Sequence, residues 1–256
     1  MNNETITAAP ATPAPASPPR GGLTLEENTQ AMRRWCQGHA LHALVMQDPF
    51  THRAVTKPRG YAGDAVMMDF IYDGTPPAGT SAVGADVFRA TARAGMGLSV
   101  RYRRQLLRSL IDDTVVRHEQ PRLLSVAAGH CRELQGSLVE APGFAGEFVA
   151  LDQDPLSCQE IARAHAGQPV RVVNQGVREL AGSAQGSVLA DSLGRFDLIY
   201  SAGLYDYLPD ALARRLQPGF RRGAGLAGAG KTFEPGPRAP VGLGQRDLAR
   251  RQRIGG

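Results

Sequence analysis

The 256-residue sequence predicts an α/β fold in which a parallel sheet follows a helical region. Two observations carry this prediction. Between residues 119 and 210, apolar segments of strand length alternate with longer amphipathic segments, which is typical of a parallel sheet with crossover helices. In addition, Gly129 directly follows the first apolar segment and lies 23 residues (152 − 129) before Asp152, which ends the second one.

The first segment of the chain predicts no packed structure. Residues 1–22 contain five prolines, and no Lys or Arg precedes Arg20. This composition is typical of a disordered tail, and the segment lacks the basic start and apolar run of a secretory signal. No apolar run in the sequence reaches the roughly 18 residues of a membrane span. We therefore expect a disordered tail rich in Pro and Ala, without a targeting or membrane segment.

Residues 23–118 predict a helical region. Thr24 and Glu27 have the spacing of a capping box, which marks the start of a helix. Further along, apolar residues recur at intervals of three and four, as they do on one face of a helix. We expect this region to form a lid over one edge of the sheet. The expected helices cover about 25–46, 64–72 and 85–114.

Four apolar segments in residues 119–216 predict the strands of the sheet. The first breaks at Gly129 into the start of a helix, and the second ends at Asp152. In a right-handed β-α-β unit, this spacing places a tight turn, a helix N-terminus and a carboxylate at the C-terminal edge of the sheet. A nucleoside fits such an edge, because a carboxylate accepts hydrogen bonds from ribose hydroxyls. The four segments begin near residues 121, 148, 170 and 195.

This arrangement resembles the class I S-adenosylmethionine-dependent methyltransferases, over roughly residues 119–210. The resemblance implies a Rossmann-like sheet, S-adenosylmethionine as the cofactor and a small-molecule acceptor. Three motifs narrow it to a bacterial subfamily that includes enzymes methylating the carboxyl of 3-hydroxypalmitic acid. These motifs are KPRGYAGDAVMMDFIY (57–72), AAGHCRE (127–133) and SAGLYDYL (201–208).

The resemblance assigns cofactor contacts to residues that follow the four strands. Each assignment has a structural alternative: a plain strand-to-helix glycine for Gly129, a helix-capping aspartate for Asp152, and a simple loop for residues 175–177. Asp154 and Pro155 already supply a helix cap after the second strand, which favours the ribose role for Asp152. The implied cofactor residues are Ala128, Gly129, Asp152, Gln153, Gln175, Gly176, Val177, Ser201, Ala202 and Gly203.

The glycine loop departs from the usual pattern of the superfamily. Ser125 stands where an acid is usual, and Ala127 and Cys131 stand where glycines are usual, so only Gly129 of three glycines is present. A dinucleotide needs close backbone approach to its pyrophosphate at several glycines. S-adenosylmethionine has no phosphate. The loop therefore disfavours a dehydrogenase and tolerates the proposed cofactor.

The chemistry of methyl transfer demands few protein groups. A sulfonium methyl is already electrophilic, so rate comes mainly from holding the reacting atoms in line. An ionised carboxylate acceptor needs no base, whereas a hydroxyl or amine needs one such as His130 or Asp206. Arg59 and Tyr61 either orient the acceptor or belong to a structural turn, and Tyr205 either walls the acceptor pocket or lies in the core. No metal-ligand spacing is evident, so we expect no metal.

The distribution of charge and cysteine bears on partners and location. Of the net charge of +5, residues 217–256 contribute +6 (eight basic and two acidic residues), leaving −1 for the rest. A nucleic-acid enzyme would be expected to carry its basic patch around the site, so nucleic-acid binding through the basic tail is the weaker alternative. Three scattered cysteines suggest a reducing cytoplasm. The arginines expected on the third helix, at 101, 103 and 104, either meet a carboxylate or form a solvated face.

Residues 217–256 do not fit the fold of the superfamily. They hold ten glycines and four prolines in forty positions, with no apolar run long enough for a strand. Methyltransferases of this class need three further strands, and we expect these strands to be missing, as in a truncated or frameshifted chain. A disordered basic tail is the alternative. Two functions therefore stand: a small-molecule methyltransferase, and a non-catalytic remnant that binds the cofactor weakly or not at all.

Overall fold

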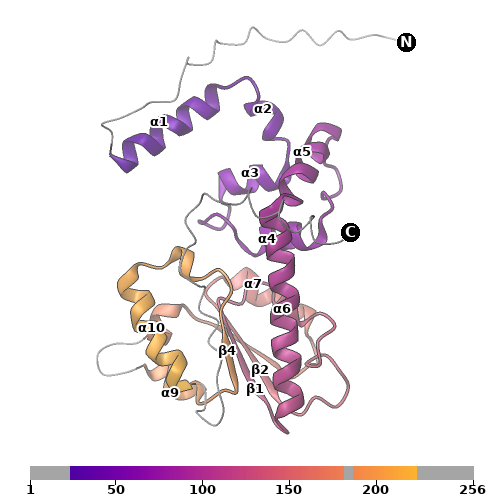
Figure 1. Cartoon of the computed structure of the whole chain (residues 1–256), viewed down its shortest axis with the longest axis vertical. Helices are drawn as coiled ribbons and strands as arrows, with labels where there is room; N and C mark the ends of the chain where they lie inside the picture. Colours follow the sequence, from indigo (N-terminus) through magenta and orange to yellow (C-terminus); the bar gives the residue numbers. More distant parts are fainter. Residues whose placement is uncertain (1–23, 182–186, 224–256) are drawn as a thin grey trace, which may run out of the picture.

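The computed structural model describes residues 24–181 and 187–223, and it consists of a helical region packed on an α/β unit (Figure 1). The tail expected over 1–22 and residues 224–256 of the expected C-terminal tail lie outside these ranges. Helix α6 belongs to both parts, since it runs from the helical region down along the sheet (Figure 1). No helix in the described ranges is long and apolar enough to cross a membrane.

Six helices precede the sheet. The capping box starts α1 as predicted, because the Thr24 side chain accepts from the Glu27 backbone N–H at 3.3 Å and the Thr24 N–H donates to the Glu27 carboxylate at 2.9 Å. The α4 helix matches the second expected helix and is capped by Asp64. The helices are α1 (Leu25–Gly38), α2 (His42–Val45), α3 (Pro49–Thr56), α4 (Ala65–Asp73), α5 (Ala82–Ala92) and α6 (Gly95–Arg117).

The other two predicted helices are each divided in the structure. The helix expected over 25–46 breaks after Gly38, where His39 takes an extended conformation. The helix expected over 85–114 is divided into α5 and α6. The two helices meet closely at Gly97, where an added Cβ would lie 2.2 Å from the Ala92 carbonyl oxygen. Helix α3 was not predicted, although its Asp48 cap and Pro49 start are a regular helix signal.

The sheet has four parallel strands in the order β3-β2-β1-β4, each at a position where the sequence predicts a strand. In the described part of the chain, β4 pairs with β1 alone. The strands are β1 (Arg122–Val126), β2 (Glu147–Asp152), β3 (Val170–Asn174) and β4 (Leu198–Tyr200).

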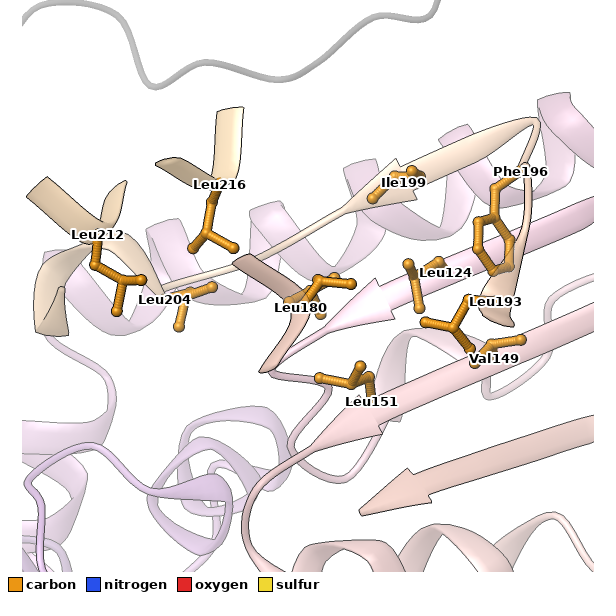
Figure 2. Packing of buried hydrophobic residues seen from close by; sticks show 11 residues of the cluster. Leu124, Val149, Leu151, Leu180, Leu193, Phe196, Ile199, Leu204, Leu212 and Leu216 are labelled. Carbon is orange, nitrogen blue, oxygen red and sulfur yellow. The ribbon is translucent and has the colours of Figure 1, made fainter. Parts of the chain in front are cut away.

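Apolar residues cover both faces of the sheet. On one face, leucines of α8 (Val177–Ala181), α9 (Val188–Leu193) and α10 (Asp210–Gly223) belong to one apolar cluster with Leu124 and Leu151. In Figure 2, the two α10 leucines lie beside Leu204. On the other face, α6 and α7 (Pro155–Ala164) pack over the remaining strand side chains. The result is a three-layer α/β arrangement. Helix α10 continues to Gly223, beyond the boundary at 216 expected for the sheet domain.

The helix expected to start after Gly129 is not formed. The segment between β1 and β2 contains only a 3-10 turn, η1 (Arg132–Leu134). Ala127, Gly129 and Cys131 all have positive φ (57°, 59° and 50°), a conformation that an α-helix cannot continue through. Helix α6 instead supplies the cover on this face, with Leu107 and Ile111 in the same buried cluster as Leu134.

Candidate functional site

Asp152 is the centre of the candidate site. Its side chain is 6% exposed. One carboxylate oxygen accepts from the Gly129 N–H at 2.8 Å, and the other accepts from the Asp154 N–H at 2.8 Å. Each oxygen of an ionised carboxylate has a second acceptor position. The carboxylate thus joins the turns that follow β1 and β2 and keeps acceptor capacity for a ligand hydroxyl.

The cap of α7 is Asp154 rather than Asp152. The Asp154 side chain accepts from the Leu156 N–H at 3.1 Å, and Pro155 follows at the first helical position. Burial raises the pKa of Asp152, an effect that the two backbone N–H donors oppose and the nearby Asp154 carboxylate adds to. Asp152 is therefore a buried acid whose role is not explained by helix capping.

The glycine turn after β1 is tight and closely covered. Gly129 lies in the left-handed region, with φ 59°, where residues with a Cβ are strained. An added Cβ there would sit 3.5 Å from the Cβ of Ala65, the first residue of α4. The turn predicted at Gly129 is therefore present, and the helical region packs directly against it.

The other predicted cofactor residues follow the ends of β2, β3 and β4, on the same edge of the sheet. The Gln175 N–H donates to the Asp152 carbonyl oxygen at 3.0 Å, which sets the end of β3 beside Asp152. A Cβ on Gly176 would lie 3.8 Å from the Gln153 side-chain oxygen. Val177 starts α8 and packs against the cluster beneath the sheet. Ser201, Ala202 and Gly203 directly follow β4 and are half-buried.

Residues 57–64, here named the strap, lie against this edge. Arg59 Nη1 donates to the Asp154 carboxylate at 2.6 Å and to Ser157 Oγ at 2.9 Å. Beyond β4, the Tyr207 hydroxyl donates to the Ala62 carbonyl oxygen, and the Tyr61 and Tyr207 rings meet edge to face at 5.8 Å between centroids. The strap is thus anchored both near the end of β2 and in the segment after β4.

Tyr61 faces the acids of the site. Burial, together with Asp152, Asp154 and Asp64, raises the pKa of Tyr61 to about 12, against the opposing effect of Arg59. The phenol therefore stays protonated near neutral pH and is available as a hydrogen-bond donor. Among the predicted catalytic candidates, Arg59, Tyr61 and His130 are the three that the structure brings close to the Asp152–Asp154 turn.

His130 is held between a carboxylate and a guanidinium. Its Nδ1 lies 2.8 Å from an Asp69 oxygen, and its Nε2 lies 3.4 Å from Arg59 Nη1. Because an ionised carboxylate can only accept, we assign an imidazole proton to Nδ1. Arg132 binds the same Asp69 carboxylate at 2.7 and 2.9 Å. The contact of Nδ1 with Asp69 therefore helps to dock α4. The two hydrogens of Arg59 Nη1 already have the closer acceptors Asp154 and Ser157, so Nε2 is only weakly engaged.

Tyr205 and Asp206, the remaining catalytic candidates, lie after β4. Tyr205 packs against the apolar cluster that α8, α9 and α10 form on the sheet. Asp206 is exposed. Neither position singles out a base within the described part of the site.

The arginines of α6 contact protein rather than forming a solvated face. Arg101 Nε donates to the Ile71 carbonyl oxygen at 2.7 Å, and Arg104 Nε donates to the Arg132 carbonyl oxygen at 2.9 Å. Arg103 approaches the end of β4 instead: a Cβ added to Gly203 would lie 3.8 Å from Arg103 Nη1. The solvated-face alternative is therefore wrong.

Glu133, a buried acid near Arg103, was not among the predicted site residues. The Tyr200 hydroxyl donates to Glu133 Oε1 at 2.6 Å, and both side chains are buried. Burial raises the pKa of Glu133, while the hydrogen bond from Tyr200 and the charges of Arg104 and Arg103 oppose that rise. Its only sequence signal was its place in the AAGHCRE motif. No group of three or more His, Cys, Asp or Glu in the described ranges could hold a metal ion.

Comparisons with known proteins find likeness in structure alone. The sequence matches no protein-family profile and no curated protein. The structure is similar to a possible exported protein from Bordetella parapertussis, at 19% identity and a TM-score of 0.51, over 79% of this chain and 70% of that one. At this identity, the likeness concerns the fold only.

Weaker structural matches include S-adenosylmethionine-dependent methyltransferases. One is a TehB-like enzyme from Corynebacterium glutamicum, at 16% identity and a TM-score of 0.34, over 51% of this chain and 66% of that one. Another is the CurJ carbon methyltransferase, at 12% identity and a TM-score of 0.38, over 78% of this chain and 62% of that one. The chain thus spans slightly less than two thirds of the length of either enzyme. These matches do not identify the narrower bacterial subfamily.

Proposed function

We propose that this chain binds S-adenosylmethionine at the C-terminal edge of its sheet and transfers the methyl group to a small-molecule acceptor. The observation that carries the proposal is the Asp152 carboxylate, which is buried, tied to the Gly129 turn and still able to accept hydrogen bonds. An acid in that place suits the two hydroxyls of a ribose. The donor set of the site therefore fits the cofactor.

The residues around Asp152 would hold the rest of the cofactor. Gln153 and Gly176 lie together beside Asp152 and suit the adenine, while Ser201 to Gly203 are small enough for close approach of the sulfonium end. When bound, S-adenosylmethionine supplies an electrophilic methyl group. The protein's part is to position the ligands and exclude water, and the strap, anchored on both sides of the edge, suits that task.

The acceptor that fits best is a carboxylate. An ionised carboxylate requires no general base, so this acceptor needs nothing of His130, whose Nδ1 is held by Asp69 at 2.8 Å. The resemblance of three motifs to enzymes that methylate 3-hydroxypalmitic acid supports the carboxyl of a hydroxy fatty acid. The near-neutral charge before residue 217 disfavours nucleic acid, and three free cysteines support a cytoplasmic setting.

The second candidate is a non-catalytic protein that keeps only part of the cofactor site. The observation that favours it is that β4 pairs on one side only within the described residues. Ser201 to Gly203 directly follow this strand. Such a protein would bind the cofactor weakly or not at all. Weak binding without methyl transfer to any carboxylate acceptor, or no binding, would support this candidate.

The Asp152→Asn variant tests the proposed site. A hydrogen bond to a charged group contributes about 1.5–3 kcal/mol, so loss of the carboxylate should weaken binding of S-adenosylhomocysteine by roughly 10- to 150-fold in calorimetric titration. Asp113→Asn, at an exposed position on α6, is the matched control and should bind like wild type. Equal affinity of the Asp152→Asn variant and wild type would refute the assignment.

A further inference from the structure

The end of β4 contains buried polar atoms without partners. Three buried side-chain polar atoms in the described ranges make no hydrogen bond: Arg103 Nε, Ser201 Oγ and Ser137 Oγ. Two of these belong to residues at the end of β4, since Ser201 directly follows the strand and Arg103 approaches Gly203. Buried polar groups in folded proteins are nearly always paired, so unpaired ones call for an explanation such as a missing partner.

Arg103 differs in this respect from its two neighbours on α6. Arg101 and Arg104 each donate from Nε to a backbone carbonyl oxygen, at 2.7 and 2.9 Å. These contacts brace α6 against α4 and η1. The guanidinium of Arg103 forms a hydrogen bond with the Tyr72 side chain, but its Nε is buried without an acceptor. The packing of α6 therefore accounts for only part of its donors.

Arg103 also forms no direct ion pair in the described part of the chain. Within the described ranges, no carboxylate oxygen lies within 4.0 Å of its nitrogens. Glu133 is near enough for the charges of Arg104 and Arg103 to oppose the rise in its pKa, but it lies beyond ion-pair distance of Arg103 and its Oε1 accepts from Tyr200 at 2.6 Å. A half-buried guanidinium with a free Nε–H and no directly paired carboxylate attracts an anion.

We propose that Arg103 and Ser201 form a carboxylate-binding subsite at the end of β4. A guanidinium offers two parallel N–H donors that match the two oxygens of a carboxylate, and the Ser201 hydroxyl supplies a further donor from the strand end. Gly203 leaves room beside Arg103, since its own Cβ position would lie 3.8 Å from Nη1. The source of the carboxylate rests on the proposed function: it is either the amino-acid end of the cofactor or the acid group of the acceptor.

Three probes separate these sources in calorimetric titrations of the full chain. S-adenosylhomocysteine carries the nucleoside and a carboxylate, 5′-methylthioadenosine carries the nucleoside alone, and 3-hydroxydecanoate carries an acceptor-like carboxylate. Arg103→Met should lower the affinity for one carboxylate probe by at least 10-fold and leave the affinity for methylthioadenosine unchanged. Loss of S-adenosylhomocysteine binding assigns the subsite to the cofactor, and loss of hydroxydecanoate binding assigns it to the acceptor.

Matched variants guard against a purely structural effect. Arg108→Met, on the same helix and half exposed, should bind all probes like wild type. Ser201→Ala should lower the affinity for the same probe that Arg103→Met affects, by roughly 2- to 10-fold, which is the effect expected from losing one neutral hydrogen bond. Without ligand, Arg103→Met should unfold at about the same urea concentration as wild type, because the loss of the hydrogen bond with Tyr72 offsets the removal of an unpaired buried donor.

Several results would overturn the subsite. Unchanged affinity of Arg103→Met for both carboxylate probes would overturn it. An equal loss of affinity for methylthioadenosine and S-adenosylhomocysteine would also overturn it, because such a loss would show a general disturbance of the site. If wild type binds neither nucleoside probe, the proposed function fails, and the subsite then stands only if Arg103→Met abolishes binding of hydroxydecanoate. Failure of wild type to bind any of the three probes refutes both.

Discussion

Replacing Arg59 with Met should loosen the attachment of the strap to the sheet. The Arg59–Asp154 ion pair is short, at 2.6 Å, and its side chains are only 13% and 10% exposed. Removing one partner of a fully buried pair costs about 3–5 kcal/mol, because the other charge is left unpaired. Here Asp154 keeps hydrogen bonds from the Leu156 N–H and Ser157 Oγ. We therefore expect a loss of about 2–3 kcal/mol in the free energy of unfolding.

Urea denaturation, followed by circular dichroism, measures this loss. Arg163→Met is the matched control, because Arg163 also pairs with an acid, Glu160, at 2.9 Å but is 74% exposed. Such a surface pair contributes under about 0.5 kcal/mol. If Arg59→Met is as stable as Arg163→Met, the strap does not depend on this ion pair. A loss of hydroxydecanoate binding without a loss of stability would instead place Arg59 on the acceptor.

Two further substitutions test the buried acid and the last helix. Burial raises the pKa of Glu133. The contribution of Glu133 to stability is therefore full below the ordinary pKa of a glutamate and is lost as pH rises through the raised pKa of the folded state. Glu133→Gln should thus gain stability relative to wild type as pH increases from 4.5 to 8. Thermal unfolding across that range checks this, and a pH-independent difference would contradict it. Leu216→Ala should cost about 2–5 kcal/mol in urea denaturation, because Leu216 is 1% exposed within the cluster of Figure 2. The same change at the exposed Leu156 is the control, and a loss below about 1 kcal/mol would show that α10 is not part of the core.

The strands were predictable because their signals are local. Each of the four apolar segments is short, is bounded by polar or turn residues and forms a strand. The Thr24 capping box and the Asp154 cap are equally local patterns, and both are present. The helix expected after Gly129 failed because three residues with positive φ, two of them not glycine, keep the chain from continuing as a helix. Nothing in the identity of Ala127 or Cys131 signals that conformation.

The candidate site was predictable only in part, for a similar reason. In a parallel sheet, the residues that follow the strands share one edge, so spacing alone placed Gly129 and Asp152 together, and the structure joins them by a 2.8 Å hydrogen bond. The Asp69–Arg132 and Glu133–Tyr200 pairs connect residues 63 and 67 positions apart. A single sequence carries no local signal for such partners, and the distinct role of Arg103 among three arginines depends on the same distant packing.

Thermal unfolding of the full chain, with and without S-adenosylhomocysteine, tests the central claim of a nucleoside site at Asp152 most directly. Ligand at about 100 times its dissociation constant adds roughly 2.7 kcal/mol to the stability of a folded protein that binds it. For a domain of this size, that gain should raise the midpoint by about 5–11 °C. A rise of this size that Asp152→Asn abolishes is the predicted result. A midpoint that stays unchanged across millimolar ligand would contradict the site.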